Sequence, residues 1–192
     1  VKDPKFRRFR YGMQVNSLGL TETQPENNVY RILIQMLPVV IAKKSRARAV
    51  QLPAWNEALG LPRPWDQQWS LRLQQIMAFE TDLLEFDDIT SGSKVINEKV
   101  RSLKLSAYNE LKKVDQLGGL VEAIEKGYMK SKLVESQTSR QKSIENGDQK
   151  VVGVNCFSEG EKSPLILEND GGFMKVDEKS EKKQILNVKN WK

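Results

Sequence analysis

Residues 46–69, RARAVQLPAWNEALGLPRPWDQQW, decide how the fold of this chain is interpreted. The run Ala47–Leu52 predicts a short buried strand, and Pro53 ends it because proline offers no amide to a strand ladder. Residues 55–62 are too short and too rich in glycine and proline for a long helix, so they predict a loop. A loop with an acid, an amide and an indole directly after a strand is typical of α/β proteins that bind ligands.

The composition predicts a globular chain and excludes several classes of active site. The 192 residues are 39% hydrophobic and 29% charged, enough for one domain with a sizeable core. The absence of histidine excludes a Ser-His-Asp triad, a histidine-ligated zinc site and an imidazole base within these residues. The single cysteine, Cys156, is expected to be a small apolar residue and indicates a reducing compartment, here the cytoplasm.

No membrane or nucleic-acid partner is expected. The longest apolar run, near Ile32–Ala42, is broken by Gln35 and Pro38 and is shorter than the roughly 18 residues of a membrane span. The formal charge of +6 invites a nucleic-acid hypothesis. The lysines after Lys99, however, alternate with acidic residues at helical spacing, which is typical of a solvated face. The chain begins at Val1 with no initiator methionine, so we expect a piece of a longer protein.

The first half of the chain predicts a strand, a helix and a second strand. Residues 11–17 predict a strand with Gln14 and Asn16 on one face, either paired with neighbouring strands or turned toward a ligand inside a barrel. Residues 21–42 predict a helix, with Thr21 and Gln24 at capping-box spacing and Pro38 kinking or ending the helix one turn early. Such a βαβ unit pairs its strands in parallel through a right-handed crossover.

The second half predicts mostly helices whose role is packing. Helices are expected at residues 69–86, 95–117, 120–126 and 129–146, with a turn at 87–93. The paired glycines 118 and 119 are expected to end the helix before them. Residues 151–156, VVGVNC, predict an apolar strand, residues 158–176 an extended linker, and Asp177 the cap of a last helix.

Several motifs, in order, resemble one enzyme family. Asn56–Pro62, NEALGLP, resembles the Asp/Asn-Glu-Ala-Leu-Gly-Leu-Pro segment of the coenzyme B12-dependent acyl-CoA mutases. Residues 17–31, 118–127 and 151–155 resemble further segments of these enzymes in the same order. The turn at 87–93 keeps Asp88, Gly92 and Ser93 but lacks the tyrosine that follows in much of the family. This departure and the residues around NEALGLP favour the ethylmalonyl-CoA mutase branch over methylmalonyl-CoA mutase.

The resemblance implies an α/β fold class, the C-terminal portion of a (β/α)8 TIM barrel with a helical extension and a C-terminal linker. Residues 1–157 would be the C-terminal part of the catalytic barrel, and 158–192 the linker toward a cobalamin-binding domain outside this sequence. The two opening strands would be the last two of the barrel, where ligands sit at the C-terminal ends of the strands.

The resemblance also implies binding residues. Glu57 would contact the ribose of the adenosyl group, and Gln14 and the backbone around Ser17, Gly60 and Leu61 would lie against the corrin. Ser17 stands where the family often has glycine. Ala49 and Gln51 are candidate substrate-lining residues. Their alignment with the family depends on where a gap near residues 43–48 is placed. One placement aligns Gln51 with a family histidine, and a later one aligns it with a family glutamine.

The implied activity is a radical rearrangement of the carbon skeleton of an acyl-CoA, of the ethylmalonyl-CoA or methylmalonyl-CoA type, with adenosylcobalamin as cofactor. The cobalt ligand would lie outside this chain. The partners would be the acyl-CoA, the remainder of the barrel and a cobalamin-binding domain or subunit, within a homodimer or heterodimer. Alone, the chain is expected to be inactive because its strand edges would be unpaired. The alternative is a non-enzymatic helical interaction module, supported by the long helices between residues 70 and 147 and requiring no role for Glu57.

Overall fold

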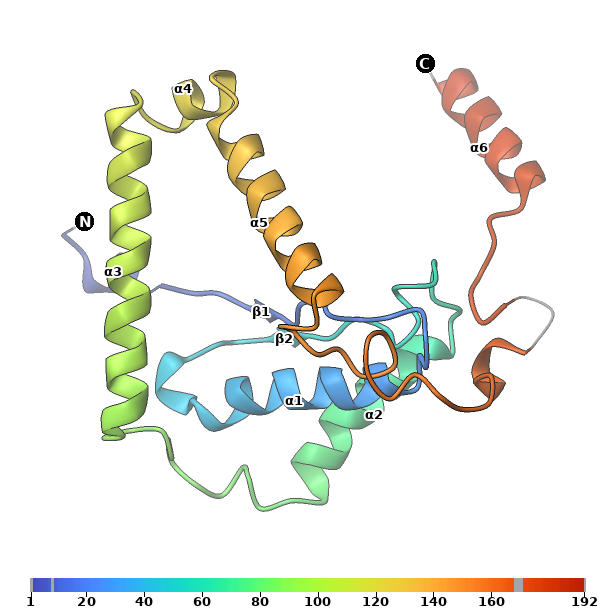
Figure 1. The fold of residues 1–192 in the computed structure, drawn as a ribbon, viewed down its shortest axis with the longest axis horizontal. Coiled ribbons are helices and arrows are strands. Elements are labelled where there is room, and N and C mark those ends of the chain that lie inside the picture. Colours follow the sequence, from blue (N-terminus) through green and yellow to red (C-terminus); the bar gives the residue numbers. More distant parts are fainter. Residues whose placement is uncertain (1, 8, 168–170, 192) are drawn as a thin grey trace. The chain divides into compact units, whose positions relative to one another are not determined.

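The computed structural model describes residues 2–7, 9–167 and 171–191. The chain forms two compact units, one made of Val1–Ile89 and Gly160–Lys192 and the other of Thr90–Glu159. The first unit contains the helices and strands of the expected βαβ unit, and the second is helical (Figure 1). None of the helices in the described part of the chain combines the length and the apolar character that crossing a membrane requires.

The two opening strands are short and run parallel. β1, Met13–Gln14, pairs with β2, Val50–Gln51, so that Met13 lies beside Val50 and Gln14 beside Gln51. Further backbone bonds extend the pairing on both sides, from the Arg48 amide to Tyr11 at 3.0 Å and from the Val15 amide to Gln51 at 2.9 Å. The parallel pairing confirms the expected βαβ unit. Two strands show a small parallel sheet and not yet a barrel.

Helix α1, Asn27–Ile41, begins six residues later than the sequence predicts. The expected capping box is wrong: the Thr21 hydroxyl donates to the Thr23 carbonyl, and Gln24 has a positive φ of 46° that no helix tolerates. Of the two effects expected of Pro38, a kink or an early end, the early end does not occur. Residues beyond Pro38 still bond backward, as the Ala42 amide does to the Pro38 carbonyl at 3.1 Å, so the helix runs on to Ile41.

The core of this unit lies on one face of the strand pair, where α1 and α2, Asp66–Phe79, pack. Its buried members come from the two strand segments, the loop after β1 and both helices: Val15, Leu20, Ile32, Met36, Leu52 and Met77. Because successive side chains of a strand point to opposite faces, the alternate residues Gln14, Ala49 and Gln51 are exposed on the other face. α2 begins and ends earlier than the expected 69–86, and residues 80–93 form turns before the next helix.

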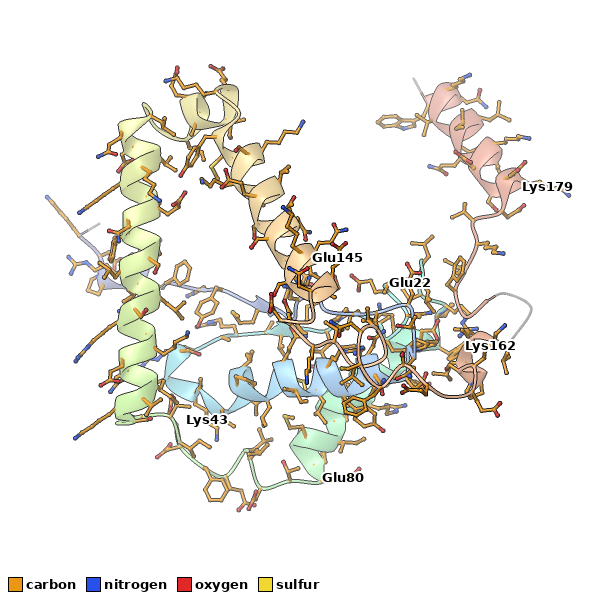
Figure 2. All side chains as sticks on the ribbon, viewed as in Figure 1. Glu22, Lys43, Glu80, Glu145, Lys162 and Lys179 are labelled. Atoms are coloured by element: carbon orange, nitrogen blue, oxygen red, sulfur yellow. The ribbon has the colours of Figure 1, made fainter. Side chains whose placement is uncertain are left out.

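A short 3₁₀ turn, η2 at Lys43–Ser45, follows α1 and fastens it to the chain after α2. Figure 2 labels Lys43 at this end of α1, where its ammonium group donates to the carbonyls of Leu84 and Phe86. The Lys44 amide also donates to the Asp88 carboxylate at 2.6 Å. The first three residues of the segment 43–48 therefore form a folded turn.

The second unit consists of α3, Lys94–Gln116, α4, Leu120–Glu125, and α5, Tyr128–Glu145. The helices agree closely with those expected, including the end of α3 before the two glycines. The strand expected at residues 151–156 is wrong, because this segment is a turn closed by a bridge between Val152 and Cys156. Asn155 holds the turn: its side chain accepts from the Val151 amide and donates to the Ile144 and Gln149 carbonyls.

Much of the segment expected as an extended linker belongs to the first unit and is partly folded. Two further 3₁₀ helices are η1, Pro4–Arg7, at the start of the chain, and η3, Pro164–Ile166, within this segment. Residues 171–174 lie beside the loop after β2, where Leu61 and Met174 form an antiparallel bridge. The last helix, α6, spans Glu178–Trp191 as expected. The division into a barrel part at 1–157 and a linker at 158–192 stays a prediction.

Candidate functional site

The exposed face of the strand pair carries two amides side by side. Gln14 and Gln51 are partners in the parallel register, and both side chains are exposed. Among the described residues neither side chain has a hydrogen-bond partner, whereas Asn16 accepts from the Leu18 amide at 2.8 Å and stabilises a turn. The two glutamines are therefore the polar groups of this face that remain available to a ligand or to further strands.

The loop after β2 has a buried beginning and an exposed carboxylate. Ala54, Trp55 and Asn56 are fully or almost fully buried, whereas Glu57 is exposed. The Asn56 carbonyl accepts from the amides of Leu59 at 2.8 Å and Gly60 at 3.2 Å, which closes a tight turn around Glu57. In the described part of the chain the Glu57 carboxylate has no hydrogen-bond or ion-pair partner. The fold thus presents an unsatisfied acceptor on a fixed turn.

Asp66, at the start of α2, holds the buried side of this loop. Its fully buried carboxylate accepts from the Trp55 indole at 3.0 Å, the Asn56 amide at 2.7 Å and the Arg63 backbone amide at 2.7 Å. The Arg63 guanidinium, also buried, pairs with it at 3.0 Å. A buried charge is tolerated only when it is paired and hydrogen-bonded, and this carboxylate is both. Ser70, one turn further along α2, donates to the Pro53 carbonyl at 2.6 Å.

A second polar cluster joins this loop to the loop after β1. The Asn28 amide donates to the Trp55 carbonyl at 2.8 Å and to the Thr21 carbonyl at 2.9 Å, and its oxygen accepts from the Thr21 amide at 3.0 Å. Arg31 donates to the Asn28 oxygen and to the Thr21 hydroxyl, each at 2.8 Å, and partial burial lowers the pKa of its guanidinium. The motif residues Thr21, Asn28 and Arg31 thus fix the two loops at the carboxyl ends of the strands to each other.

The structure brings most of the predicted binding residues to the carboxyl ends of the strands. Glu57, Gly60 and Leu61 belong to one turn, and Ser17, half-buried, lies in the loop after β1, where its carbonyl accepts from the Leu20 amide at 2.9 Å. Ala49 and Gln51 are two residues apart and lie on the same exposed face. Both placements of the alignment gap therefore lead to the same face of the sheet.

The sequence did not predict the residues that hold the loop after β2 in place, whereas it did predict an acidic residue on that loop. Asp66 carried no motif signal beyond its position three residues after Arg63. The segment Gly172–Met174 was assigned to a linker, although the Gly172 carbonyl accepts from the Asn56 amide at 2.7 Å. The paired glycines 171 and 172, which both have a positive φ, are a local sequence sign of a tight turn there.

The resemblance predicts that these groups form part of an adenosylcobalamin site, and their chemistry is compatible with that prediction. Among the described residues the exposed Glu57 carboxylate has no partner and can accept hydrogen bonds from ribose hydroxyls, and the exposed side chains of Gln14 and Gln51, likewise without partners there, can bond polar groups of a ligand. The chain contains no histidine, so it supplies no histidine ligand to a metal ion. No cluster of three or more Cys, Asp or Glu that could hold a metal ion occurs within residues 2–7, 9–167 and 171–191.

Comparison with known proteins places the chain among acyl-CoA mutases. The family model described as methylmalonyl-CoA mutase matches residues 1–192. The chain is 57% identical to ethylmalonyl-CoA mutase of Cereibacter sphaeroides and 58% identical to that of Methylorubrum extorquens, in both cases over its whole length. It is 30% identical over 172 residues to methylmalonyl-CoA mutase of Escherichia coli. The chain covers 29%, 28% and 24% of these three relatives, respectively, so it spans less than a third of their length.

Proposed function

This chain belongs to the methylmalonyl-CoA mutase family, and we propose that it supplies the last two strands of the catalytic barrel of an adenosylcobalamin-dependent acyl-CoA mutase. The ethylmalonyl type is favoured because identity to the two ethylmalonyl-CoA mutases is nearly twice that to the methylmalonyl-CoA mutase of Escherichia coli. The observation that carries the proposal is the exposed Glu57 carboxylate, unpartnered among the described residues, at the carboxyl end of a parallel strand.

The two faces of the strand pair support a place in a barrel wall. One face is covered by α1 and α2, as the outside of a (β/α)8 barrel is. The other face carries Gln14, Ala49 and Gln51 and remains exposed. The outer edges of two parallel strands also offer unpaired amides and carbonyls, which further strands would satisfy. Both features are what a segment cut from a closed barrel should show.

In the proposed site Glu57 accepts hydrogen bonds from the ribose hydroxyls of the adenosyl group. The exposed backbone of Gly60 and Leu61, with Gln14 and Ser17 from the other strand, lies against the corrin. Bound adenosylcobalamin supplies the radical chemistry, and this chain positions it and helps to exclude water. Ala49 and Gln51 line the acyl end of the substrate, where the small Ala49 side chain leaves space and the Gln51 amide can donate to a carbonyl oxygen.

The proposed partners follow from the share of the relatives that the chain covers. The remaining strands, the CoA-binding residues and the cobalt ligand would come from the rest of the mutase and from a cobalamin-binding domain or subunit, in a homodimer or heterodimer. We place this assembly in the cytoplasm, where the single thiol of Cys156 remains reduced.

A chimera tests the proposal directly. The chain replaces the matching 29% of Cereibacter sphaeroides ethylmalonyl-CoA mutase, and both mutase turnover and adenosylcobalamin affinity are measured. Turnover by the chimera is expected. The substitution Glu57→Gln should weaken cofactor binding by about tenfold, because a charged acceptor of two hydroxyls is lost.

The matched control for this substitution is Glu80→Gln. Glu80 is exposed at the C-terminal end of α2 and is labelled in Figure 2, and its replacement should leave both quantities unchanged. A chimera without turnover, or a Glu57→Gln variant with unchanged cofactor affinity, would contradict the proposal. If the Glu57→Gln variant kept both its cofactor affinity and its turnover, the residues of this loop would have only a packing role.

A further inference from the structure

We propose that residues 171–174 form a strap that fixes the loop carrying Glu57, with Asn56 and Phe173 as positioning residues for the Glu57 carboxylate. This inference rests on the proposed contact between Glu57 and the adenosyl ribose. It goes beyond that contact because it assigns a task to side chains that touch no ligand and to a segment about 115 residues further along the chain.

The first point of attachment is the side chain directly before Glu57. The Asn56 amide nitrogen has two protons, and both are used: one donates to Asp66 at 2.7 Å and the other to the Gly172 carbonyl at 2.7 Å. The opposite amide orientation would turn an oxygen toward two acceptors, so the orientation is fixed by the network. The Asn56 oxygen is buried and has no partner in the described part of the chain, so the side chain acts through its two donors.

The second point of attachment is a ring packed on a glycine. A Cβ atom on Gly60 would lie 2.7 Å from Cδ2 of Phe173, so the ring occupies the space that any larger residue at position 60 would need. The Met174 amide then donates to the Leu61 carbonyl at 2.8 Å. The strap thus contacts the residue before Glu57 and both of the glycine-turn residues proposed to face the corrin.

The strap is itself held in a tight turn. Gly172 has a φ of 82°, and a Cβ atom there would lie 2.8 Å from the Leu165 carbonyl oxygen. Only glycine fits this combination of positive φ and close approach. The strap thus contacts Asn56 and Gly60 at once and fixes the backbone of the turn that carries the Glu57 carboxylate.

A double-mutant cycle in the chimera separates positioning from simple structural support. Asn56→Ala and Phe173→Ala should each weaken adenosylcobalamin affinity by about tenfold, the usual cost of losing a residue that orients a ligand-binding group. In a Glu57→Ala background, where no carboxylate remains to be positioned, the same substitutions should change the affinity less than twofold. Phe173→Leu, which keeps an apolar group over Gly60, should restore most of the affinity.

The control and a second readout keep the result independent of turnover. Phe79→Ala, at an exposed ring of the same unit, should leave the affinity unchanged. Amide hydrogen exchange at Leu59 and Gly60 should become faster in Phe173→Ala, because the turn loses its cover. Equal losses of affinity with and without Glu57, or unchanged exchange at these amides, would overturn the strap. An inactive chimera, or a Glu57→Ala variant with full affinity, would instead overturn the proposed function.

Discussion

At the residue scale, the candidate site depends on one buried carboxylate. Asp66 accepts hydrogen bonds from three residues of the loop before it, and its charge is balanced by the buried guanidinium of Arg63. Replacing it by asparagine keeps the shape but leaves a neutral group facing that guanidinium. Asp66→Asn should therefore lower the free energy of unfolding by about 3 kcal/mol, the order found when one partner of a buried ion pair is removed.

Urea unfolding of the chimera, followed by tryptophan fluorescence, measures this loss, because Trp55 donates to Asp66 and lies 5.7 Å from the Trp69 ring. Asp82→Asn, at an exposed position between α2 and α3, is the matched control and should stay within about 0.5 kcal/mol of the parent. An equal, small change in both variants would show that the Asp66 network does not stabilise the loop.

The loop that Asp66 holds shows what the sequence could and could not predict. Glu57 was predicted on a loop after a strand because a local pattern, an apolar run ended by Pro53, encodes it. The bond between Asn56 and Gly172 joins residues 116 positions apart, and no periodicity or spacing signals such a contact. The position of Glu57 on a loop after a strand could thus be predicted from the sequence, whereas the contacts that hold this loop become apparent only in the folded chain.

At the scale of elements, regular periodicity predicted helices well and their beginnings poorly. α3 agrees with its prediction to within about one residue at each end, because Ser93 caps it and two glycines follow. α1 begins late because the Thr21 backbone bonds to the Asn28 side chain, which also donates to the Trp55 carbonyl, and Thr21 does not cap the helix. Residues 151–156 have strand-like composition, yet Asn155 bonds its side chain to three backbone groups and forms a turn.

The joint between α3 and α5 gives a pH-dependent prediction. The Tyr128 hydroxyl donates to Glu110 at 2.5 Å, and this bond, with that from Lys113, lowers the pKa of Glu110 from its ordinary value of 4.5. A carboxyl group with a lowered pKa in the folded state stabilises that state above its unfolded pKa, and the stabilisation is lost as pH falls through the folded value. Tyr128→Phe should thus lower the melting temperature at neutral pH and have progressively less effect on acidification.

Thermal scans of the parent chimera and the variant across the acidic range measure this convergence. Tyr108→Phe, at an exposed ring on α3, is the control and should show no pH-dependent difference from the parent. A Tyr128→Phe penalty that stays constant from neutral to strongly acidic pH would show that the lost interaction does not depend on the charge of Glu110.

At the scale of the whole molecule, the helical unit has too little core to explain its own apolar residues. Neither α3 nor α5 contains a buried residue, yet apolar side chains recur along α3 at helical spacing. Leu103 and Leu111 remain 59% and 58% exposed. The ethylmalonyl-CoA mutase of Cereibacter sphaeroides is more than three times as long as this chain. We propose that the rest of such a mutase covers the stripe, since a leucine gains about 2 kcal/mol when it is buried.

The effect of removing this stripe should therefore depend on what surrounds the chain. The double substitution Leu103→Ser/Leu111→Ser should leave the isolated 192-residue chain no less stable and reduce its binding of a hydrophobic dye. In the chimera the same change should cost about 4 kcal/mol if both side chains are buried there, measured as a lower urea midpoint.

Lys104→Ser/Lys112→Ser, at exposed charged positions of the same helix, is the control and should be nearly neutral in both settings. A loss of stability confined to the isolated chain would mean that the stripe packs within these residues, and the rest of the mutase would then not be what covers it.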